Sequence, residues 1–247
     1  MAQILGIDIG GSGIKGALVD TESGELATER HRIPTPRPAK PGKVADTVRQ
    51  LVAEFDYSGP VGCCFPTIVI DGVAKSASNM GEEWIDLAVD ETFSAATGLP
   101  FTVLNDADAA GMAEMRLGAG VGLGGLVITI TVGTGIGSAL FYRGQLIPNL
   151  ELGHMAGKGG ISIELWASDR ARKQEGLSWE EWGERFDRFL QRAARVCSPD
   201  HFILGGGASK KYDNFRHVLT VTTPIHVARF RNNAGIIGAA MAVVDRD

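Results

Sequence analysis

Two stretches of the sequence decide the fold: "GGSGIKGAL" at residues 10–18 and "VGTGIGSAL" at residues 132–140. Aligned from Gly11 and Gly133, they are identical at five of eight positions. Each follows an apolar run, which is typical of a buried strand. Glycine-rich hairpin turns are common, so chance is the alternative, but the shared strand–turn–strand pattern favours an internal repeat. The repeat predicts two related lobes, each beginning with a β-hairpin.

The composition limits the class of protein. The chain has 247 residues, of which 44% are hydrophobic and 21% charged, as is ordinary for a soluble globular protein. Its net charge of −5 argues against general binding to nucleic acid or anionic membranes. Three cysteines cannot all pair, and Cys63 and Cys64 are adjacent, which is typical of a reducing compartment. Without a signal peptide or an apolar run near ~20 residues, we expect a cytoplasmic protein with no nucleic-acid or membrane partner.

Strand and helix signals alternate along the chain. Apolar runs predict strands at 3–10 and 14–20, with a third at about 25–33, and Asp71-Gly72 predicts a hairpin turn. Ser178 and Glu181 form a capping box at the start of a long helix. The expected helices span residues 43–55, 85–97, 107–118, 177–196 and 232–244. The alternation predicts an α/β fold.

The two glycine turns predict a phosphate site. Such turns leave backbone N–H groups unshielded, so that an anion binds against them. Ser12 and Thr134 add hydroxyl donors, and Lys15 adds a positive charge. The spacings of a Walker A loop and of a dinucleotide fingerprint are absent. We therefore expect a clamp for a phosphoryl donor. Its phosphate-binding residues would be Asp8, Gly10, Gly11, Ser12, Lys15, Gly133, Thr134 and Gly135.

Asp8 lies near the end of the first strand, beside the first glycine turn. Magnesium keeps several waters in proteins and binds through one or two carboxylates together with phosphate oxygens. We expect Asp8 to hold Mg²⁺ through water. The alternative is that Asp8 only caps its own turn.

The stretch "LNDADAAG" (104–111) follows a buried strand and opens a helix. Open α/β sheets bind ligands at the C-terminal edge of their strands, and a carboxylate there accepts a proton from a hydroxyl nucleophile. Helix capping is the alternative role for these side chains. We expect Asp106 to take part in the chemistry and Asp108 to lie closer to the cap.

The stretch "ELGH" (151–154) sets a carboxylate and an imidazole three residues apart. On a helical turn both side chains face one way and bind two neighbouring hydroxyls, although a lone histidine is more often structural. With Glu164 downstream and "SNMGEEW" (78–84) upstream, the chain offers several acceptors for a polyhydroxylated ligand.

Together, these motifs resemble those of the ROK family of sugar kinases. The residues that carry the resemblance are, in family order, "DIGGSGIK", "SNMGEEW", "LNDADAAG", "TVGTGIGSAL", "ELGH" and "FILGGGASKK". The resemblance implies the actin/Hsp70/hexokinase-like ATPase fold, an α/β fold with two lobes and a central cleft. It implies a small lobe of residues 1–104, a larger lobe of residues 105–232, and a last helix, 233–247, that returns to the first lobe. It also implies a homodimer.

The resemblance further implies the roles of residues. Asp106 would be the base that deprotonates the sugar hydroxyl. The sugar-binding residues would be Asn79, Asn105, Asp106, Glu151, His154 and Glu164. Typical members carry a zinc-binding cysteine cluster after the ELGH-like motif. The segment that follows "ELGH" here has no cysteine, so no zinc is expected.

Four stretches, "RIPTPRP", "ASDRARK", "LSWEEW" and "GGGASKK", look like the polyphosphate glucokinase branch of that family. Members of this branch phosphorylate the 6-hydroxyl of glucose with inorganic polyphosphate, often with ATP, and some accept mannose. Pro66-Thr67 replaces the usual Pro-Gly, and the glycine-rich segment 156–162 also departs from the branch. Glucose and mannose therefore both stay open as substrates.

The distribution of basic residues indicates the phosphoryl donor. Polyphosphate requires a basic track, which Arg30, Arg32, Arg37, Lys40 and Lys43 supply without an acidic residue among them. Further candidates are Arg170, Arg172, Lys173, Lys210 and Lys211. Solvated surface charge is the alternative reading for all of them. Gly205, Gly206 and Gly207 would let an adenine ring lie close to the backbone, so ATP is a second expected donor.

We therefore expect a kinase that transfers a phosphoryl group from polyphosphate, and from ATP, to the 6-hydroxyl of glucose. One alternative is an ATP-dependent kinase for another hexose, such as mannose or an amino sugar. A non-catalytic sugar sensor is the other. Repressors of the family carry a helix-turn-helix before the first strand, and here that strand begins within the first few residues, which argues against the sensor.

Overall fold

The computed structural model describes residues 3–78 and 80–245, which form two compact units. The first unit runs to Ala113 and includes the segment from Asn233 onward, and the second spans Glu114–Asn232. The boundary thus falls inside α3 (Asp106–Leu117), nine residues beyond the boundary expected after residue 104.

The first unit is built on a five-stranded sheet in the order β3-β2-β1-β4-β7. Its central strand β1 is antiparallel to β2 and parallel to β4, which in turn is parallel to β7. Its strands are β1 (Gln3–Gly10), β2 (Gly13–Asp20), β3 (His31–Ile33), β4 (Val61–Phe65) and β7 (Phe101–Asn105).

The second unit has a sheet of the same topology, in the order β10-β9-β8-β11-β12. Strand β8 is antiparallel to β9 and parallel to β11, which is parallel to β12. Its strands are β8 (Leu126–Val132), β9 (Ile136–Tyr142), β10 (Gln145–Ile147), β11 (His201–Gly205) and β12 (Ile225–Val227). Both repeated sequence stretches therefore form the hairpin that opens a sheet, as the repeat predicts.

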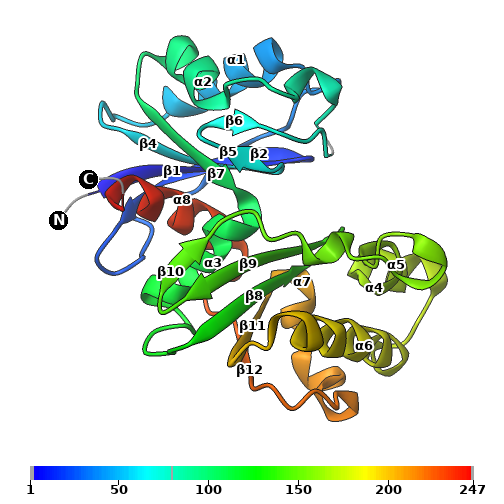
Figure 1. The fold of residues 1–247 in the computed structure, drawn as a ribbon. Helices are drawn as coiled ribbons and strands as arrows, with labels where there is room; N and C mark the ends of the chain where they lie inside the picture. The colour runs from blue at the N-terminus through cyan, green and yellow to red at the C-terminus, as the bar shows by residue number, and fades with distance from the viewer. Residues whose placement is uncertain (1–2, 79, 246–247) are drawn as a thin grey trace. The chain divides into compact units, whose positions relative to one another are not determined.

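Helices cover both faces of the first sheet (Figure 1). Helix α8 (Ala234–Val244) lies against β1 and β4, while α1 (Pro41–Val52) and α2 (Val89–Thr97) lie on the opposite face. The small residues of α8 allow a close approach: a Cβ built on Gly62 of β4 would lie 1.8 Å from the carbonyl oxygen of Ala239. The expected hairpin at Asp71-Gly72 joins β5 (Val69–Ile70) to β6 (Val73–Ala74), and both turn residues have positive φ.

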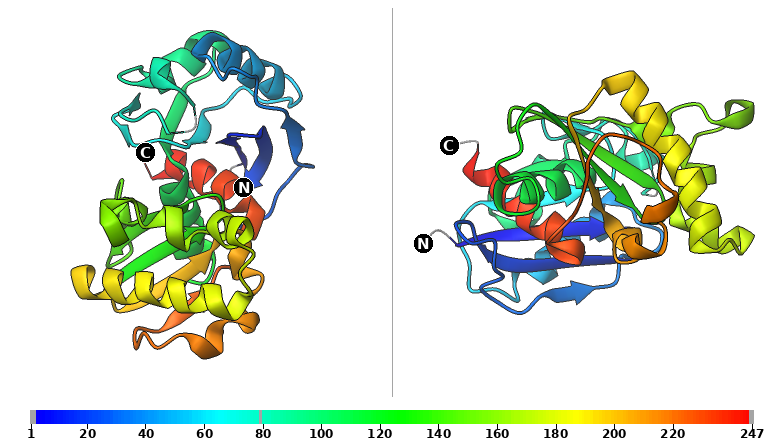
Figure 2. Two further views of the ribbon diagram at one scale, coloured as in Figure 1. Left: turned by 90° about the vertical axis from the view of Figure 1, so that its right-hand side faces the viewer. Right: turned by 90° about the horizontal axis from the view of Figure 1, so that it is seen from below.

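The core of the second unit forms against α6 (Trp179–Cys197), one continuous helix that Figure 2 draws in yellow. Its capping box is present, because Ser178 Oγ accepts from Glu181 N and Glu181 accepts from Ser178 N. Trp182, Phe186 and Leu190 pack into one buried cluster with the strands. The shorter helices are α4 (Glu164–Ala167), α5 (Asp169–Glu175) and α7 (Gly206–Ser209).

Two features differ from expectation. The third strand is shorter than 25–33, since only an isolated bridge joins Val19 to Leu26 and Thr28 Oγ1 accepts the hydrogen bond from Leu18 N. In the described ranges, short 3₁₀ helices also join the larger elements: Glu82–Trp84, Leu152–His154, Lys158–Gly160, Tyr212–Asn214, Arg216–Val218 and Arg231–Asn233. Among the described residues, no helix is both long and apolar enough to span a membrane.

Candidate active site

Asp8 is held on both sides of its carboxylate. Lys15, its partner in the β1–β2 register, places Nζ 2.8 Å from Asp8 Oδ2. Cys64, its partner on β4, donates its thiol to Asp8 Oδ1 at 3.5 Å. Burial raises the pKa of the Cys64 thiol well above its usual range, and the Asp8 charge adds to the increase. The thiol is therefore neutral and acts as a donor to the carboxylate.

The first glycine turn is fixed from the neighbouring strand and connector. Arg32 Nη2 donates to the carbonyl oxygen of Ser12 at 2.7 Å, and Thr35 Oγ1 donates to the carbonyl oxygen of Gly10 at 2.5 Å. Gly11 and Ser12 are exposed at the tip of the turn. Their backbone is thus held in place while the tip stays open to a ligand.

The second glycine turn lies against three other segments of its own unit. Gly133 O accepts from Arg170 N at 3.2 Å, and Ile136 N donates to Glu164 Oε2 at 3.1 Å. Gly206 bridges to Val132, and a Cβ on Gly206 would lie 2.5 Å from the Val132 backbone nitrogen. The segment Gly205–Gly207, expected to bind a nucleotide, therefore lies directly beside this turn.

Asn105 forms the cap of α3. Its Oδ1 accepts from Ala107 N at 2.8 Å and from Asp108 N at 3.2 Å, and its Nδ2 donates to Thr67 O at 2.9 Å. The expectation that Asp108 lies closer to the cap is wrong: Asp108 is buried, and the side chain one residue before the helix occupies that role. Asp106, by contrast, is exposed in the first turn of the helix, as a base must be to reach a substrate.

Thr67 lies in the loop after β4. Its φ is not positive, so its backbone is not left-handed. It is buried, and its carbonyl is the one that Asn105 binds. Replacing the family's glycine at this position therefore introduces no backbone strain there.

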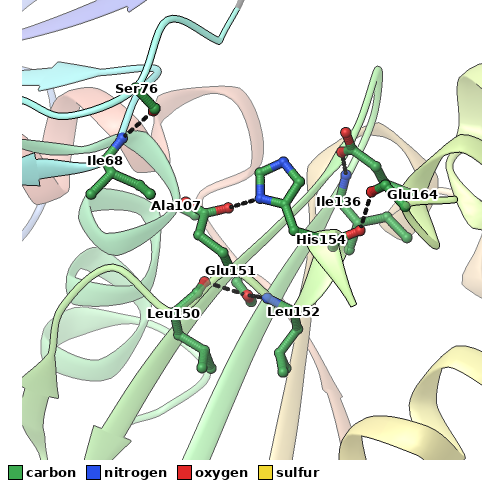
Figure 3. A network of polar contacts seen from close by, with 12 residues as sticks. Ile68, Ser76, Ala107, Ile136, Leu150, Glu151, Leu152, His154 and Glu164 are labelled. Atoms are coloured by element: carbon green, nitrogen blue, oxygen red, sulfur yellow. Dashed lines mark hydrogen bonds and ion pairs between the residues drawn. The ribbon is translucent and has the colours of Figure 1, made fainter. Parts of the chain in front are cut away.

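Glu151, His154 and Glu164 gather in the second unit (Figure 3). Glu151 precedes a 3₁₀ turn, and its Oε2 lies 3.2 Å from His154 Nδ1. Burial raises the pKa of Glu151; the neighbouring Glu164 carboxylate adds to the increase, while the His154 imidazole opposes it. Because residues three apart align in a 3₁₀ turn, both polar groups face the same way.

This segment is held tightly in place. Ser138 Oγ of β9 donates to Leu150 O at 2.6 Å and accepts from Leu152 N at 3.0 Å. A Cβ on Gly153 would lie 2.2 Å from Ile136 O, so the chain passes directly over the strand that follows the second turn. Ser138 is a supporting residue that the sequence analysis missed, because its partners lie 12 and 14 residues away.

Four of the basic candidates of the second unit separate into two groups. Arg172 lies 3.9 Å from the centre of the Trp179 ring, and Arg172 and Lys173 both pair with Asp169, at 2.8 and 2.7 Å. These two cations support the helix, so they are poor candidates for a phosphate track. Lys210 and Lys211 are exposed beside the Gly205–Gly207 segment.

Asn79 lies outside the described residues. Within the part of the chain that the structure describes, no three histidine, cysteine, aspartate or glutamate side chains group as a metal site. A single carboxylate at Asp8 suits a cation such as Mg²⁺, which takes most of its ligands from water and phosphate.

Comparisons with known proteins show the family and the fold of this chain. Residues 4–164 match the ROK family. Polyphosphate glucokinase from Mycobacterium tuberculosis is 43% identical over 97% of this chain and 90% of its own length. The crystal structure of inorganic polyphosphate/ATP-glucomannokinase from Arthrobacter superposes with a TM-score of 0.95 at 45% identity, covering 100% of both chains.

A more distant structure supports the fold alone. A ROK family glucokinase from Streptomyces griseus, in complex with glucose and AMPPNP, superposes with a TM-score of 0.82 at 24% identity over 97% of this chain and 98% of its own. The fold expected from the sequence, an α/β fold of the hexokinase-like class, is confirmed. The chain belongs to the ROK family.

Proposed function

We propose that this chain is a glucose kinase that transfers the terminal phosphoryl group of inorganic polyphosphate to the 6-hydroxyl of glucose. The observation that carries the proposal is the end-to-end likeness to the Arthrobacter polyphosphate/ATP-glucomannokinase, at 45% identity and a TM-score of 0.95. The name of that relative also supports ATP as a second donor.

Asp106 is the proposed base. Its exposed position in the first turn of α3 supports this role, in which the carboxylate would accept the proton of a sugar hydroxyl as the oxygen attacks phosphorus. Asn105 is largely committed to the helix cap and to Thr67, so its contribution is to hold Asp106 and the Thr67 loop in register.

Glu151, His154 and Glu164 are the proposed sugar-binding residues of the second unit. Glu151 and His154 present an acceptor and a donor side by side, which suits two neighbouring hydroxyls of a hexose. Glu164 already accepts a hydrogen bond from Ile136 N, which directly follows the second glycine turn. It would therefore link sugar binding to the position of that turn.

Each glycine turn is proposed to bind phosphate oxygens through backbone N–H groups and a hydroxyl, of Ser12 in one turn and Thr134 in the other. Asp8 would hold Mg²⁺ through water, and the cation would neutralise charge on the phosphates when bound. Lys15 already neutralises Asp8, and it would lie beside the incoming donor.

The sugar assignment is tested by supplying purified protein with Mg²⁺, polyphosphate and one acceptor at a time: glucose, mannose, 6-deoxyglucose or an N-acetylated hexosamine. The proposal predicts a 6-phosphate from glucose and none from 6-deoxyglucose. Phosphorylation of the amino sugar at a higher kcat/KM than glucose would favour the alternative kinase. Absence of product from every sugar, in folded protein that binds glucose, would favour the sensor.

A further inference from the structure

A row of charged side chains crosses the first sheet beside the glycine turn. Asp8 on β1 is opposite Lys15 on β2, and Lys15 is opposite Arg32 on β3. Directly opposed residues of antiparallel strands point to the same face, so the three side chains share one face of the sheet. Strands lie about 4.8 Å apart, which places the Arg32 backbone about 10 Å from that of Asp8, at the sheet edge.

The Arg32 guanidinium lies against the turn itself. Its Nη2 donates to Ser12 O at 2.7 Å, and a Cβ built on Gly13 would lie 2.5 Å from Arg32 Nε. The missing side chain at Gly13 is what leaves room for the guanidinium. The hydrogen bond to Ser12 uses one of five N–H donors, and Arg32 is exposed.

Among the described residues, no carboxylate balances the charge of Arg32. Lys15 pairs with Asp8, but no carboxylate of the residues that the structure describes lies within ion-pair distance of Arg32. Its neighbour Arg30 donates to the neutral amide of Asn233 at 3.1 Å. Arg30 and Arg32, neither of which pairs with a carboxylate in the part of the chain that the structure describes, thus lie between the first turn and the start of α8.

We propose that Arg32 binds a phosphate of the donor beyond the group that is transferred, and so favours long inorganic polyphosphate over ATP. The proposal rests on the phosphate-binding role of the first turn given under the proposed function. Guanidinium matches phosphate oxygens in a bidentate geometry. A nucleotide ends in a nucleoside after three phosphates, whereas polyphosphate remains anionic. A cation two strands from Asp8 therefore favours the donor whose charge reaches that far.

The test compares three variants with the natural chain. Arg32→Gln keeps an N–H donor for Ser12 O and removes the charge, while Arg32→Lys keeps the charge. Arg49→Gln is the matched control, since Arg49 is an exposed arginine of α1 that pairs with the neighbouring Asp46. Binding of long-chain polyphosphate is measured by titration calorimetry. The values of kcat and KM are measured with long-chain polyphosphate, tripolyphosphate, ATP and glucose.

For Arg32→Gln we expect the Kd and KM of long-chain polyphosphate to rise about tenfold, the size of one charge-assisted contact, with smaller changes for tripolyphosphate and ATP. The dependence of Kd on salt should also weaken, because fewer counterions are displaced. Arg32→Lys should recover most of the affinity, and Arg49→Gln should match the natural chain.

Equal changes for all donors in Arg32→Gln would overturn the proposal, because they would mean that Arg32 only holds the turn. An unchanged Kd for long-chain polyphosphate would overturn it as well. Failure of the proposed function gives a different result: the natural chain would then form no sugar phosphate, while the calorimetric titration would still report on Arg32.

Discussion

At the scale of single residues, the site separates groups that can reach a substrate from groups that hold others in place. Asn105 and Asp106 are neighbours, yet the first is buried in three hydrogen bonds and the second is exposed. The same division holds for Arg172, which is stacked and paired, and for Arg32, which is exposed on β3 beside the first turn. Residue type alone does not distinguish the two roles.

Asp106→Asn is expected to lower kcat at least ~10²-fold, the scale of general-base catalysis, because the amide cannot accept the hydroxyl proton. Glucose binding and the unfolding midpoint should stay close to those of the natural chain, since the cap of α3 depends on Asn105. Initial-rate product assays, calorimetric glucose titration and thermal unfolding measure the three quantities. Asp56→Asn, the same change at an exposed loop residue, serves as the control, and near-normal turnover in Asp106→Asn would exclude Asp106 as the base.

Glu151→Gln is expected to raise stability at neutral pH while weakening glucose binding. The pKa of Glu151 is raised in the folded protein, so the folded state holds its proton more tightly than the unfolded state does. Its contribution to stability is therefore present at acid pH and is lost as pH rises through the raised pKa. The variant cannot ionise, so its Tm should exceed that of the natural chain at pH 7 and converge with it near pH 4.

Tm measured at intervals from pH 4 to pH 8 checks this sign. Glu184→Gln removes a charge from an exposed position of α6 and should give a Tm difference with little dependence on pH. A Glu151→Gln variant that is less stable than the natural chain at pH 7 would contradict a raised pKa of Glu151 in the folded protein.

At the scale of elements, α8 packs so closely in the first unit that its Gly238 leaves no room for a larger side chain. A Cβ built on Gly238 would lie 1.6 Å from the carbonyl oxygen of Ala109 in α3. Helix propensity alone favours alanine at an interior helix position by about 1 kcal/mol, but a clash with backbone outweighs it. The contact with Ala109, and not the helix propensity of alanine, therefore determines the effect of the substitution.

Gly238→Ala is accordingly expected to lose at least about 2 kcal/mol of stability or to fail to accumulate as folded protein. Gly42→Ala is the matched control, because a Cβ on Gly42 in α1 meets nothing within 4 Å. Urea unfolding followed by circular dichroism gives both midpoints. If Gly238→Ala were as stable as Gly42→Ala, the close approach of α8 to α3 would be wrong.

The elements that the sequence predicts best have local signals. The repeated turn, the Ser178–Glu181 capping box and the Asp71-Gly72 hairpin each depend on residues within a few positions of one another. Strand β12 has three residues and exists through its pairing with β11, so no local pattern marks it. The site follows the same rule: Asp8, Asp106 and the "ELGH" pair are visible in the sequence, whereas the Asn105 link to Thr67 joins residues 38 positions apart.

At the scale of the whole molecule, the chain passes between the units twice, at Ala113–Glu114 and at Asn232–Asn233. Glu114 is buried, and its carboxylate accepts from the N–H groups of Arg229 and Phe230 at 2.9 and 2.8 Å, and from Ala119 N at 2.9 Å. One side chain therefore ties the end of α3 to the segment that precedes the second passage.

Glu114→Ala is expected to lower the free energy of unfolding by about 2–4 kcal/mol, because three backbone N–H groups lose a charged acceptor. Glu114→Gln, which keeps one acceptor oxygen, should lose less. Thermal and urea unfolding measure the order of the three proteins, with Glu184→Ala as an exposed control. An Ala variant as stable as the natural chain would mean that the carboxylate does not hold the two segments together.

The most direct test of the whole account is a nucleotide-free reaction of the purified chain with glucose, Mg²⁺ and long-chain polyphosphate, followed by ³¹P NMR. A polyphosphate-dependent glucose kinase should form glucose 6-phosphate in step with the loss of phosphate units from the polymer. Folded protein that forms no sugar phosphate under these conditions, or forms it only after ATP is added, would contradict the central claim.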